Sequence, residues 1–267
     1  MVILNQAISG RPGYGLSEAC PDAYDERTNA NALVELVSKI FGKDKYIILG
    51  GHDRGARAMQ RLAVDMGQGA HPEVHGLGVF LADIVPIVDE YDSFANPNSS
   101  VGYFHWAFLP RVQDQFSLRM IMAFGGGNMA DFLNEQGAGI NATAKAQFYS
   151  DNALAVYHTF FDQLSVTNAS VWDYWSAAGP DYLDMVADQK AGRKIKMPLH
   201  VEYSQLNMVT YSGFDMKAIW GNYVDDMSLL TTQAVCCGQG HFIVELAPDE
   251  TVAQLNEFMD KLGVVRI

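Results

Sequence analysis

Short runs of apolar residues alternate along the chain with longer segments in which apolar side chains recur every three or four positions. Residues 46–49 (Tyr-Ile-Ile-Leu) are apolar throughout and are followed by two glycines. This pattern is typical of a strand buried on both faces of a parallel sheet. Similar runs predict further strands at residues 2–4, 77–81, 195–202 and 234–237. Helical spacing predicts helices at residues 31–41, 54–65 and 249–262, the last with Val252, Leu255, Phe258 and Met259 on one face.

A long helical block interrupts this alternation. Residues 99–187 are rich in aromatic residues and methionine, and they contain no convincing strand. A polar, turn-rich segment at residues 89–98 precedes the block. Strands that alternate with helices predict an α/β fold, and the interruption predicts a helical cap inserted into it. We therefore divide the chain into a first core segment (1–94), a cap (95–190) and a second core segment (191–267).

The composition narrows the class of protein. Of the 267 residues, 49% are apolar and 18% are charged, which excludes a disordered chain. No run of about 18 uncharged apolar residues occurs, so we expect no transmembrane helix. A net charge of −13 disfavours nucleic acid as a partner, because phosphate contacts need clustered Lys and Arg. The sequence leaves open whether the chain forms a homodimer.

The cysteines and the first residues bear on the cellular compartment. Cys20, Cys236 and Cys237 make no disulfide framework, and two adjacent cysteines do not easily pair with each other. The first residues contain no basic segment followed by a long apolar one, so we expect no signal peptide. These absences predict a cytoplasmic protein.

The strongest chemical motif is Gly51-His52-Asp53-Arg54-Gly55, at the point where a predicted strand meets a predicted helix. It has the form of a nucleophile elbow with Asp53 in the nucleophile position. Glycines allow the sharp turn that lifts the central side chain above the sheet, and the helix N-terminus favours an anion there. The alternative is an aspartate that only caps the helix.

The segments around this elbow resemble the fluoroacetate and haloacetate dehalogenases, a branch of the α/β-hydrolase superfamily. The resemblance includes a strand end, Leu81-Ala82-Asp83-Ile84-Val85-Pro86, and a cap helix at residues 103–109 (Tyr-Phe-His-Trp-Ala-Phe-Leu). It continues at Asp173-Tyr174 and at Gly240-His241-Phe242. The resemblance covers the chain from about residue 10 onward. It implies an α/β-hydrolase fold with a mostly parallel sheet and an inserted helical cap.

The resemblance also implies a role for the matching residues of the core. Asp53 would displace halide from the α-carbon of a small 2-haloacid and form an ester on the enzyme. His241 would activate the water that hydrolyses this ester, and Asp83 would orient His241. Arg54 and Arg57, three residues apart on one helix, would bind the substrate carboxylate.

Three cap residues, His105, Trp106 and Tyr174, would bind the leaving halide through N–H and O–H donors. Each of these assignments has a structural alternative. The three cap residues would otherwise be core packing with a satisfied polar tip. The two arginines would otherwise be solvated charges or partners of Asp83 or Asp65.

We expect no cofactor. The chain has neither G-x-x-x-x-G-K-[ST] nor G-x-G-x-x-G, so it predicts no nucleotide site. His71 and His75 share their segment with Pro72 and lack an acidic partner motif, so we expect no metal site. His52 is interpreted as a neighbour of the elbow, and the other histidines outside the motifs as surface or core groups.

The sequence departs from the dehalogenase pattern at its front. The family has three strands and a His-Gly-x-Pro-type loop before the segment that Arg11-Pro12-Gly13-Tyr14-Gly15 resembles, and here ten residues precede Arg11. That loop ordinarily supplies one N–H of the oxyanion hole. The resemblance therefore implies an N-terminally shortened fold in which a central strand of the sheet is missing.

Three functions stay open. The first is a dehalogenase that cleaves a small 2-haloacid. The second is a non-catalytic or degenerate α/β-hydrolase relative that binds small carboxylates through Arg54 and Arg57. The third is an epoxide hydrolase, which also uses an aspartate nucleophile but needs two tyrosine donors from the cap. In each case the expected partner is a small molecule.

Overall fold

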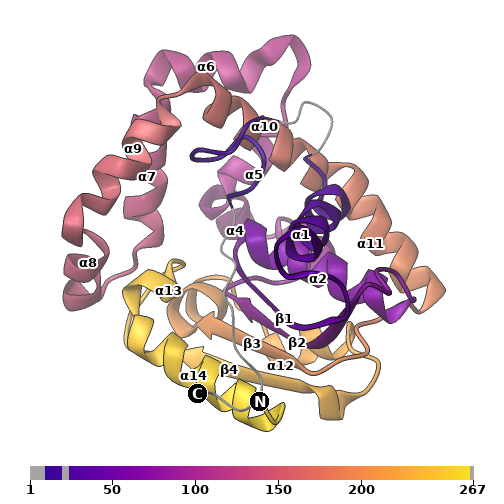
Figure 1. Ribbon diagram of the computed structural model, residues 1–267. Helices are drawn as coiled ribbons and strands as arrows, with labels where there is room; N and C mark the ends of the chain where they lie inside the picture. The colour runs from indigo at the N-terminus through magenta and orange to yellow at the C-terminus, as the bar shows by residue number, and fades with distance from the viewer. Residues whose placement is uncertain (1–9, 20–23, 265–267) are drawn as a thin grey trace.

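The computed structural model describes residues 10–19 and 24–264 (Figure 1). Four strands form one parallel sheet in the order β1-β2-β3-β4. They are β1 (Lys45–His52), β2 (Val74–Ala82), β3 (Leu199–Ser204) and β4 (Leu230–Val235). The strand predicted at residues 2–4 lies outside the described residues.

Helices cover the two faces of the sheet. The helices on one face are α1 (Glu26–Phe41), α2 (Arg54–Gly67) and α12 (Met216–Gly221), and α14 (Pro248–Lys261) lies on the other. Successive side chains of a strand point to opposite faces. In β2, Leu81 accordingly joins the core under α2, whereas the ring of Phe80 contacts Phe258 of α14. Burial on both sides explains why the second half of β2 is apolar throughout.

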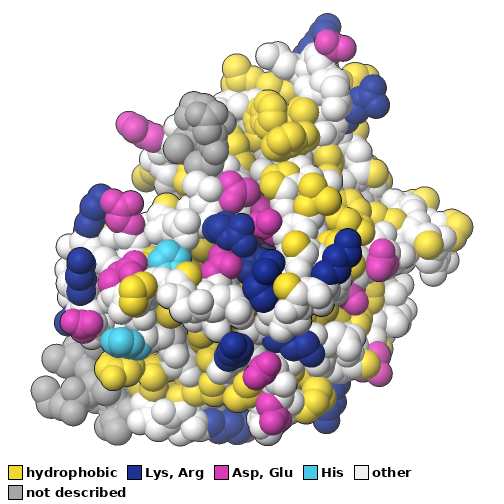
Figure 2. Space-filling view, turned by 90° about the vertical axis from the view of Figure 1, so that its right-hand side faces the viewer, with side chains coloured by type: hydrophobic (Ala, Val, Ile, Leu, Met, Phe, Trp, Pro, Cys, Tyr) yellow, Lys and Arg dark blue, Asp and Glu magenta, His cyan; other side chains and the backbone are white. Residues whose placement is uncertain are grey.

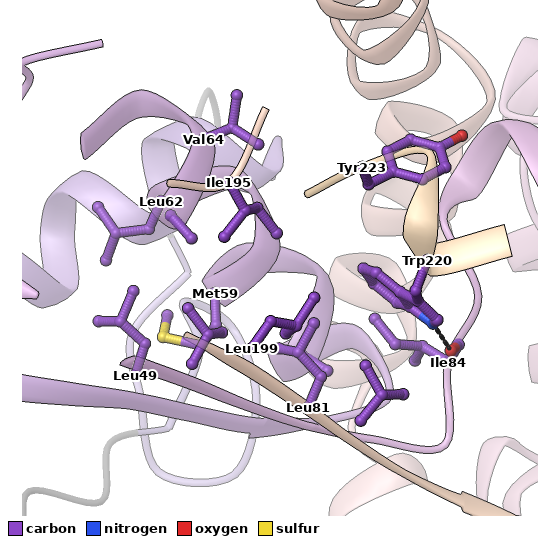
Figure 3. Close-up of a cluster of buried hydrophobic side chains, with 14 of the residues drawn as sticks. Leu49, Met59, Leu62, Val64, Leu81, Ile84, Ile195, Leu199, Trp220 and Tyr223 are labelled. Carbon is purple, nitrogen blue, oxygen red and sulfur yellow. Dashed lines mark hydrogen bonds between the residues drawn. The ribbon is translucent and has the colours of Figure 1, made fainter. Parts of the chain in front are cut away.

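The largest cluster of buried side chains fills the space between α2 and the sheet (Figure 3). Leu49 of β1 and Leu81 of β2 face Met59 of α2 in this cluster. At its edge, the indole N–H of Trp220 donates a hydrogen bond to the backbone oxygen of Ile84, 3.3 Å away. Each fully buried aliphatic side chain contributes about 1.5–3 kcal/mol. The cluster therefore anchors β1 and β2. The elbow follows the first of these strands, and Asp83 follows the second.

Between β2 and β3 the chain forms a continuous series of helices that arches above the sheet (Figure 1). They are α3 (Ile87–Ser93), α4 (Pro97–Gly102), α5 (Phe104–Phe108), α6 (Phe116–Phe124), α7 (Gly126–Gly137), α8 (Ala142–Phe148), α9 (Ala153–Phe161), α10 (Leu164–Ala178) and α11 (Pro180–Ala191). Helical character is thus observed where the sequence predicted a cap, and the division at residues 94 and 190 stays a prediction. None of the described helices is long and apolar enough to cross a membrane.

Basic and acidic side chains lie interspersed on the face of the molecule that Figure 2 shows. Ion pairs also join the cap to the core. Arg27 of α1 pairs with Asp184 of α11, as well as with Asp65 of α2 at 2.9 Å. Arg61 of α2 pairs with Asp188 of α11. Because Arg61 and Asp188 are both buried, this contact fixes α11 against α2.

The second core segment differs from the prediction at both of its strands. Residues 195–198 precede β3, and Ile195 instead forms an isolated bridge with Val224. β4 lies at residues 230–235 rather than 234–237. β4 is an edge strand of the described sheet and is only partly buried. Its centre can therefore be Thr-Thr-Gln, and the sequence shows no apolar run from which the strand could be predicted. Cys236 and Cys237 are exposed beyond its end.

Two elements begin earlier than predicted. α1 begins at Glu26 because the carboxylate of Asp25 caps it and accepts a hydrogen bond from the backbone N–H of Thr28. β2 begins at Val74, since its polar and glycine-containing first part still pairs with β1.

The last helix is confirmed in its bounds and in most of its apolar face, because Phe258 is buried and Leu255 and Met259 are half-buried. α14 spans residues 248–261, within one residue of the prediction. Val252 is exposed, and the buried residues are Gln254 and Phe258. Gln254 is buried because its side-chain oxygen is hydrogen-bonded to His200 Nε2, at 2.9 Å.

β1 is an edge strand of the described sheet: within residues 10–19 and 24–264 it pairs only with β2. The side chain of Tyr46 is 69% exposed, and Lys45 and Gly50 are exposed as well. The prediction of a strand buried on both faces was therefore wrong for the first half of β1.

Candidate active site

The turn between β1 and α2 holds Asp53 in a strained backbone conformation. Its φ is +47° and its ψ is −122°, a region that costs a residue with a side chain on the order of 1–3 kcal/mol. Gly51 permits the turn, because a Cβ there would lie 2.5 Å from the backbone N of Ala56 and from the backbone C of Gly55. Although Asp53 precedes α2, its side chain makes no capping hydrogen bond. The alternative of a capping aspartate was therefore wrong, and the carboxylate lines a cavity instead.

Asp83 follows β2 directly beside the elbow, since β1 and β2 are parallel neighbours that end at the same edge. It is fully buried. Its carboxylate accepts hydrogen bonds from the backbone N–H of Ser204 (2.6 Å), from Asn207 Nδ2 (2.9 Å) and from His241 Nδ1 (2.8 Å). A buried charge needs such partners, and these three fix the carboxylate in one orientation.

His241 joins the two aspartates. Its Nδ1 contacts Asp83, and its Nε2 lies 3.7 Å from Asp53 Oδ1. Two backbone contacts hold the residue in place. Its N–H donates to the oxygen of Gly137 in the cap (2.7 Å), and its carbonyl oxygen lies 2.8 Å from Nε2 of His52.

These charged groups set one another's protonation. Burial alone would lower the pKa of His241, but its contacts with Asp53 and Asp83 outweigh burial and raise that pKa to about 10. Burial alone would raise the pKa of Asp53, but the neighbouring His241 holds it well below its ordinary range. At neutral pH the resting site therefore contains an ionised Asp53 beside a cationic His241.

Arg54 and Arg57 are buried in the first turn of α2. Arg54 makes a two-point contact with the carboxylate of Asp173, through Nε (2.9 Å) and Nη2 (2.7 Å). Arg57 donates from Nη1 to the backbone oxygen of Val85 (2.8 Å), and its Nη2 lies 3.4 Å from Glu90. The arginines are thus neither solvated nor paired with the two aspartates that the sequence suggested as alternatives.

Each of these arginines keeps a buried nitrogen that has no partner among the described residues, Nη1 in Arg54 and Nε in Arg57. A buried donor left unpaired costs about 1–3 kcal/mol. The guanidinium carbon of Arg57 lies 4.5 Å from the ring centre of Trp106, and that of Arg54 lies 5.2 Å from the ring centre of Tyr174. Each arginine therefore keeps one N–H group that the described residues leave unpaired.

Three polar aromatic side chains meet beside the arginines. Ring centres are 5.6 Å apart for His105 and Tyr174, and 5.4 Å apart for Trp106 and Tyr174. Burial lowers the pKa of His105 to about 4, so its ring is neutral at pH 7. Within the part of the chain that the structure describes, the ring nitrogen Nδ1 of His105 is buried and has no hydrogen-bond partner. Packing with a satisfied polar tip therefore does not describe His105, whereas for Trp106 and Tyr174 both interpretations stay open.

All eight residues singled out in the sequence line one cavity of about 680 Å³ beneath the cap. They are Asp53, Asp83, His241, Arg54, Arg57, His105, Trp106 and Tyr174. Small-molecule sites typically measure about 300–1,000 Å³. No cluster of three or more His, Cys, Asp or Glu that could hold a metal ion occurs in residues 10–19 and 24–264.

The structure adds two residues that hold the histidine and its carboxylate partner. Asn207, in a π-helical segment (Gln205–Tyr211), orients Asp83. No sequence pattern pointed to it. His52 contacts the carbonyl oxygen of His241, whereas the sequence interpretation treated it only as a neighbour of the elbow.

Three further acidic residues hold the arginines, and one of them is the buried Glu26, whose Oε1 lies 3.1 Å from Arg54 Nη2. Asp173 is shared between Arg54 and Arg11, whose Nη1 and Nη2 donate to it at 2.8 and 2.6 Å. In the sequence, the only indication of a role for Asp173 was its position next to Tyr174, the predicted halide-binding tyrosine. Glu90 faces Arg57, and burial raises the pKa of Glu90 to about 7 even though Arg57 opposes the shift.

Comparisons with known proteins show the class to which the chain belongs. No family model matches the chain. A fluoroacetate dehalogenase from Burkholderia sp is 27% identical over 255 residues, which are 92% of this chain and 75% of the relative. A Nostoc sp PCC 7120 protein, provisionally assigned as an α/β hydrolase, has a TM-score of 0.77 at 29% identity and covers 93% of this chain and 79% of its own. A Pseudomonas aeruginosa protein, provisionally assigned as an epoxide hydrolase, has a TM-score of 0.78 at 26% identity, over 94% and 78% of the two chains.

The parallel sheet, the aspartate elbow and the helical cap, together with these relatives, make the chain an α/β-fold hydrolase. Within this class it is similar to the branch that contains the fluoroacetate dehalogenase, which confirms the resemblance stated from its motifs. The predicted fold class is confirmed as well.

Proposed function

We propose that the chain hydrolyses the carbon–halogen bond of a small 2-haloacid through an ester on Asp53. The observation that carries the proposal is the single cavity that holds an ionised, uncapped Asp53, two arginines with unpaired nitrogens and three polar aromatic donors. The similarity to a fluoroacetate dehalogenase supports the same substrate class.

The substrate carboxylate would bind Arg54 Nη1 and Arg57 Nε. Hydrogen bonds to a charged group contribute about 1.5–3 kcal/mol each. Asp173 and Glu90 already hold the other edges of the two guanidinium groups, so the arginines are oriented before the substrate arrives.

The halogen would lie against His105, Trp106 and Tyr174. Charge develops on the halogen as its bond to carbon breaks, and preorganised N–H and O–H donors stabilise such a charge. Because the ring of His105 is neutral, it can donate from one nitrogen without adding a fixed charge to the cavity.

In the first step, an oxygen of Asp53 forms a bond to the halogen-bearing carbon as the halide leaves with the electron pair of the breaking bond. The resulting ester is uncharged. Since His241 then retains only Asp83 as an anionic partner, its pKa falls from about 10 and its proton passes to solvent.

In the second step, His241 Nε2 accepts a proton from a water molecule whose oxygen attacks the ester carbonyl of Asp53. Cleavage of the ester releases a 2-hydroxyacid and restores the carboxylate. Asp83 stabilises the positive charge that His241 gains in this step.

Halide and glycolate release from chloroacetate and fluoroacetate tests the proposal, with the Asp53→Asn protein as the control. We expect the two products in equal amounts from the unaltered protein. Halide release no faster than with Asp53→Asn would contradict the proposal. Chloroacetate binding without turnover would favour the non-catalytic carboxylate-binding relative.

Epoxide hydrolysis is the second candidate. Tyr103 lines the same cavity as Tyr174, which provides two tyrosines near Asp53. The hydroxyl of Tyr103 is already hydrogen-bonded to Ser212, at 2.9 Å, so this candidate ranks below the first. Diol formation from styrene oxide, with no halide release from haloacids, would favour it.

A further inference from the structure

A pair of adjacent cysteines lies at the end of β4, just before the loop that carries His241. The side chains of Cys236 and Cys237 are exposed, and their Sγ atoms are 2.6 Å apart. The sequence interpretation expected adjacent cysteines not to pair easily, whereas the structure brings their sulfur atoms into direct contact.

The backbone explains how neighbouring side chains come together. In an extended strand, successive side chains point to opposite faces. Cys237, however, has a φ of +77°, in the left-handed region, and such strain persists only where the surroundings hold it. The side-chain amide of Asn141 in the cap donates to the Cys237 carbonyl oxygen (2.9 Å), and the backbone N–H groups of Ile140 and Asn141 donate to the Gly238 oxygen (2.8 and 3.0 Å).

We propose that Cys236 and Cys237 form a redox-modification site, at which a peroxide closes a small disulfide ring that changes the loop carrying His241. One thiol loses its proton, and the thiolate attacks a peroxide oxygen, which gives a sulfenic acid as the O–O bond breaks; the other oxygen leaves as hydroxide and takes up that proton to become water. The second thiol then displaces the sulfenic oxygen as a second water while the S–S bond forms. Two thiols and one hydrogen peroxide thus give one disulfide and two waters.

The reversibility follows from the same geometry. Because the two sulfur atoms are in contact, either thiol can attack the peroxide while the other resolves the sulfenic acid. The Cα atoms of neighbouring residues are about 3.8 Å apart, below the roughly 4.4–6.8 Å of ordinary disulfides. A ring that is strained and exposed is readily reduced by a dithiol.

Closure of the disulfide ring would displace groups of the active site, because the loop that carries His241 is in tight contact with the cap. Gly139 of the cap and Gln239 of the loop form an antiparallel bridge. A Cβ on Gly240 would lie 2.0 Å from the oxygen of Gly137, the atom that also accepts the N–H of His241. The loop therefore has no free space in which to absorb a reoriented Cys236–Cys237 peptide.

The first test is chemical and independent of activity. The intact protein is treated with hydrogen peroxide at pH about 8.5, near the ordinary thiol pKa, then unfolded, alkylated and digested. We expect the tryptic peptide 218–261 to carry no alkyl group and to have lost two hydrogen atoms, and dithiothreitol to restore two alkyl groups. Retention of both alkyl groups after peroxide, or pairing of either cysteine with Cys20, would overturn the proposal.

The second test measures the effect on the site and rests on the proposed function. We expect peroxide to lower halide release about tenfold, since misplacing a catalytic group by about 1 Å costs up to about 10²-fold. Dithiothreitol should restore the rate. Cys236→Ser should keep the untreated rate and resist peroxide, although its methionines oxidise as before, whereas Cys20→Ser should stay sensitive.

A ring that closes with no change in rate would overturn the link to His241. If no form of the protein releases halide, the effect on the loop is measured instead by hydrogen exchange at residues 137–141, compared between the reduced and the disulfide form. Unchanged exchange on ring closure would then overturn that link, and altered exchange would support it.

Discussion

At the residue scale, Asp53 and His241 form an ion pair in the resting site, and in the proposed mechanism the first chemical step would remove one of the two charges. The carboxylate is poised to attack, because the pKa of Asp53 is held well below its ordinary range. The imidazole is not yet a base, because the pKa of His241 is raised to about 10. The two half-reactions therefore place different demands on these residues.

We expect Asp53→Asn to abolish halide release and His241→Gln to permit only one turnover. The histidine is needed for the water step alone, so the ester should accumulate in the His241→Gln protein. Mass spectrometry of the peptide that contains Asp53 should then show one added substrate fragment. A fragment on any other peptide would refute the assignment of the nucleophile.

Selectivity for acids is expected to depend on Arg57. Arg57→Lys should lower kcat/KM for chloroacetate about 10- to 100-fold, at about 1.5–3 kcal/mol per charged hydrogen bond and 1.4 kcal/mol per decade. Chloroacetamide should be affected much less. Arg61→Lys, one turn further along α2 and bonded to Asp65 and Asp188, is the control. Equal losses for acid and amide would make Arg57 part of the scaffold only.

At the scale of elements, the strand–turn–helix unit from β1 to α2 determines where the carboxylate of Asp53 lies. The two glycines of the motif are not equivalent in this unit. A Cβ on Gly51 would collide with the backbone of Gly55 and Ala56, whereas a Cβ on Gly55 would meet no atom within 4 Å. Only the first glycine is sterically required.

We therefore expect Gly51→Ala to shift the elbow and lower the rate of ester formation about 10²-fold, the scale of a displacement of about 1 Å. Gly55→Ala should retain a rate within a few-fold of the unaltered protein. Circular dichroism and melting should show that both variants fold. Similar rates for the two alanine variants would contradict the steric argument.

Elements with a strong apolar period were predictable, and elements without one were not. The helices α2 and α14 were found within two residues of their ends, because their apolar spacing reflects packing on the sheet. β4 was misplaced because a partly buried edge strand tolerates Thr and Gln. The core residues of the site came from motifs near strand ends and its cap residues from the family resemblance, whereas Asn207 lies in a π-helical turn that leaves no spacing to recognise.

At the scale of the whole molecule, the protonation of His241 links stability to pH. A histidine whose pKa rises from about 6.5 unfolded to about 10 folded stabilises the fold fully below pH about 6.5. That contribution is lost as the pH rises toward 10, by up to about 1.4 kcal/mol per pH unit. We expect the melting temperature to fall over this range, and to fall less steeply in His241→Gln. If the melting temperature fell equally steeply with pH in both proteins, the protonation of His241 would not be the cause.

Among residues 10–19 and 24–264, no strand pairs with the outer edge of β1, and this edge is the feature most relevant to assembly. An unpaired strand edge is a template for pairing with another chain, and the side chain of Tyr46 lies exposed on that strand. We expect association that increases with protein concentration, and expect Tyr46→Lys to weaken it, because lysine on an edge strand opposes pairing. Size-exclusion chromatography coupled to light scattering measures both. A monomer at every concentration would remove the homodimer expectation.

The insertion of the helices α4 to α11 between β2 and β3 as one uninterrupted stretch has a consequence for how such an enzyme could diversify. The groups that would attack carbon and hold the carboxylate belong to the core, whereas His105, Trp106 and Tyr174 belong to the insertion. Leaving-group preference could thus be exchanged by grafting a different cap, with the attacking machinery kept. The graft would have to supply an acid in place of Asp173, because Arg11 and Arg54 would otherwise lose their shared counter-ion.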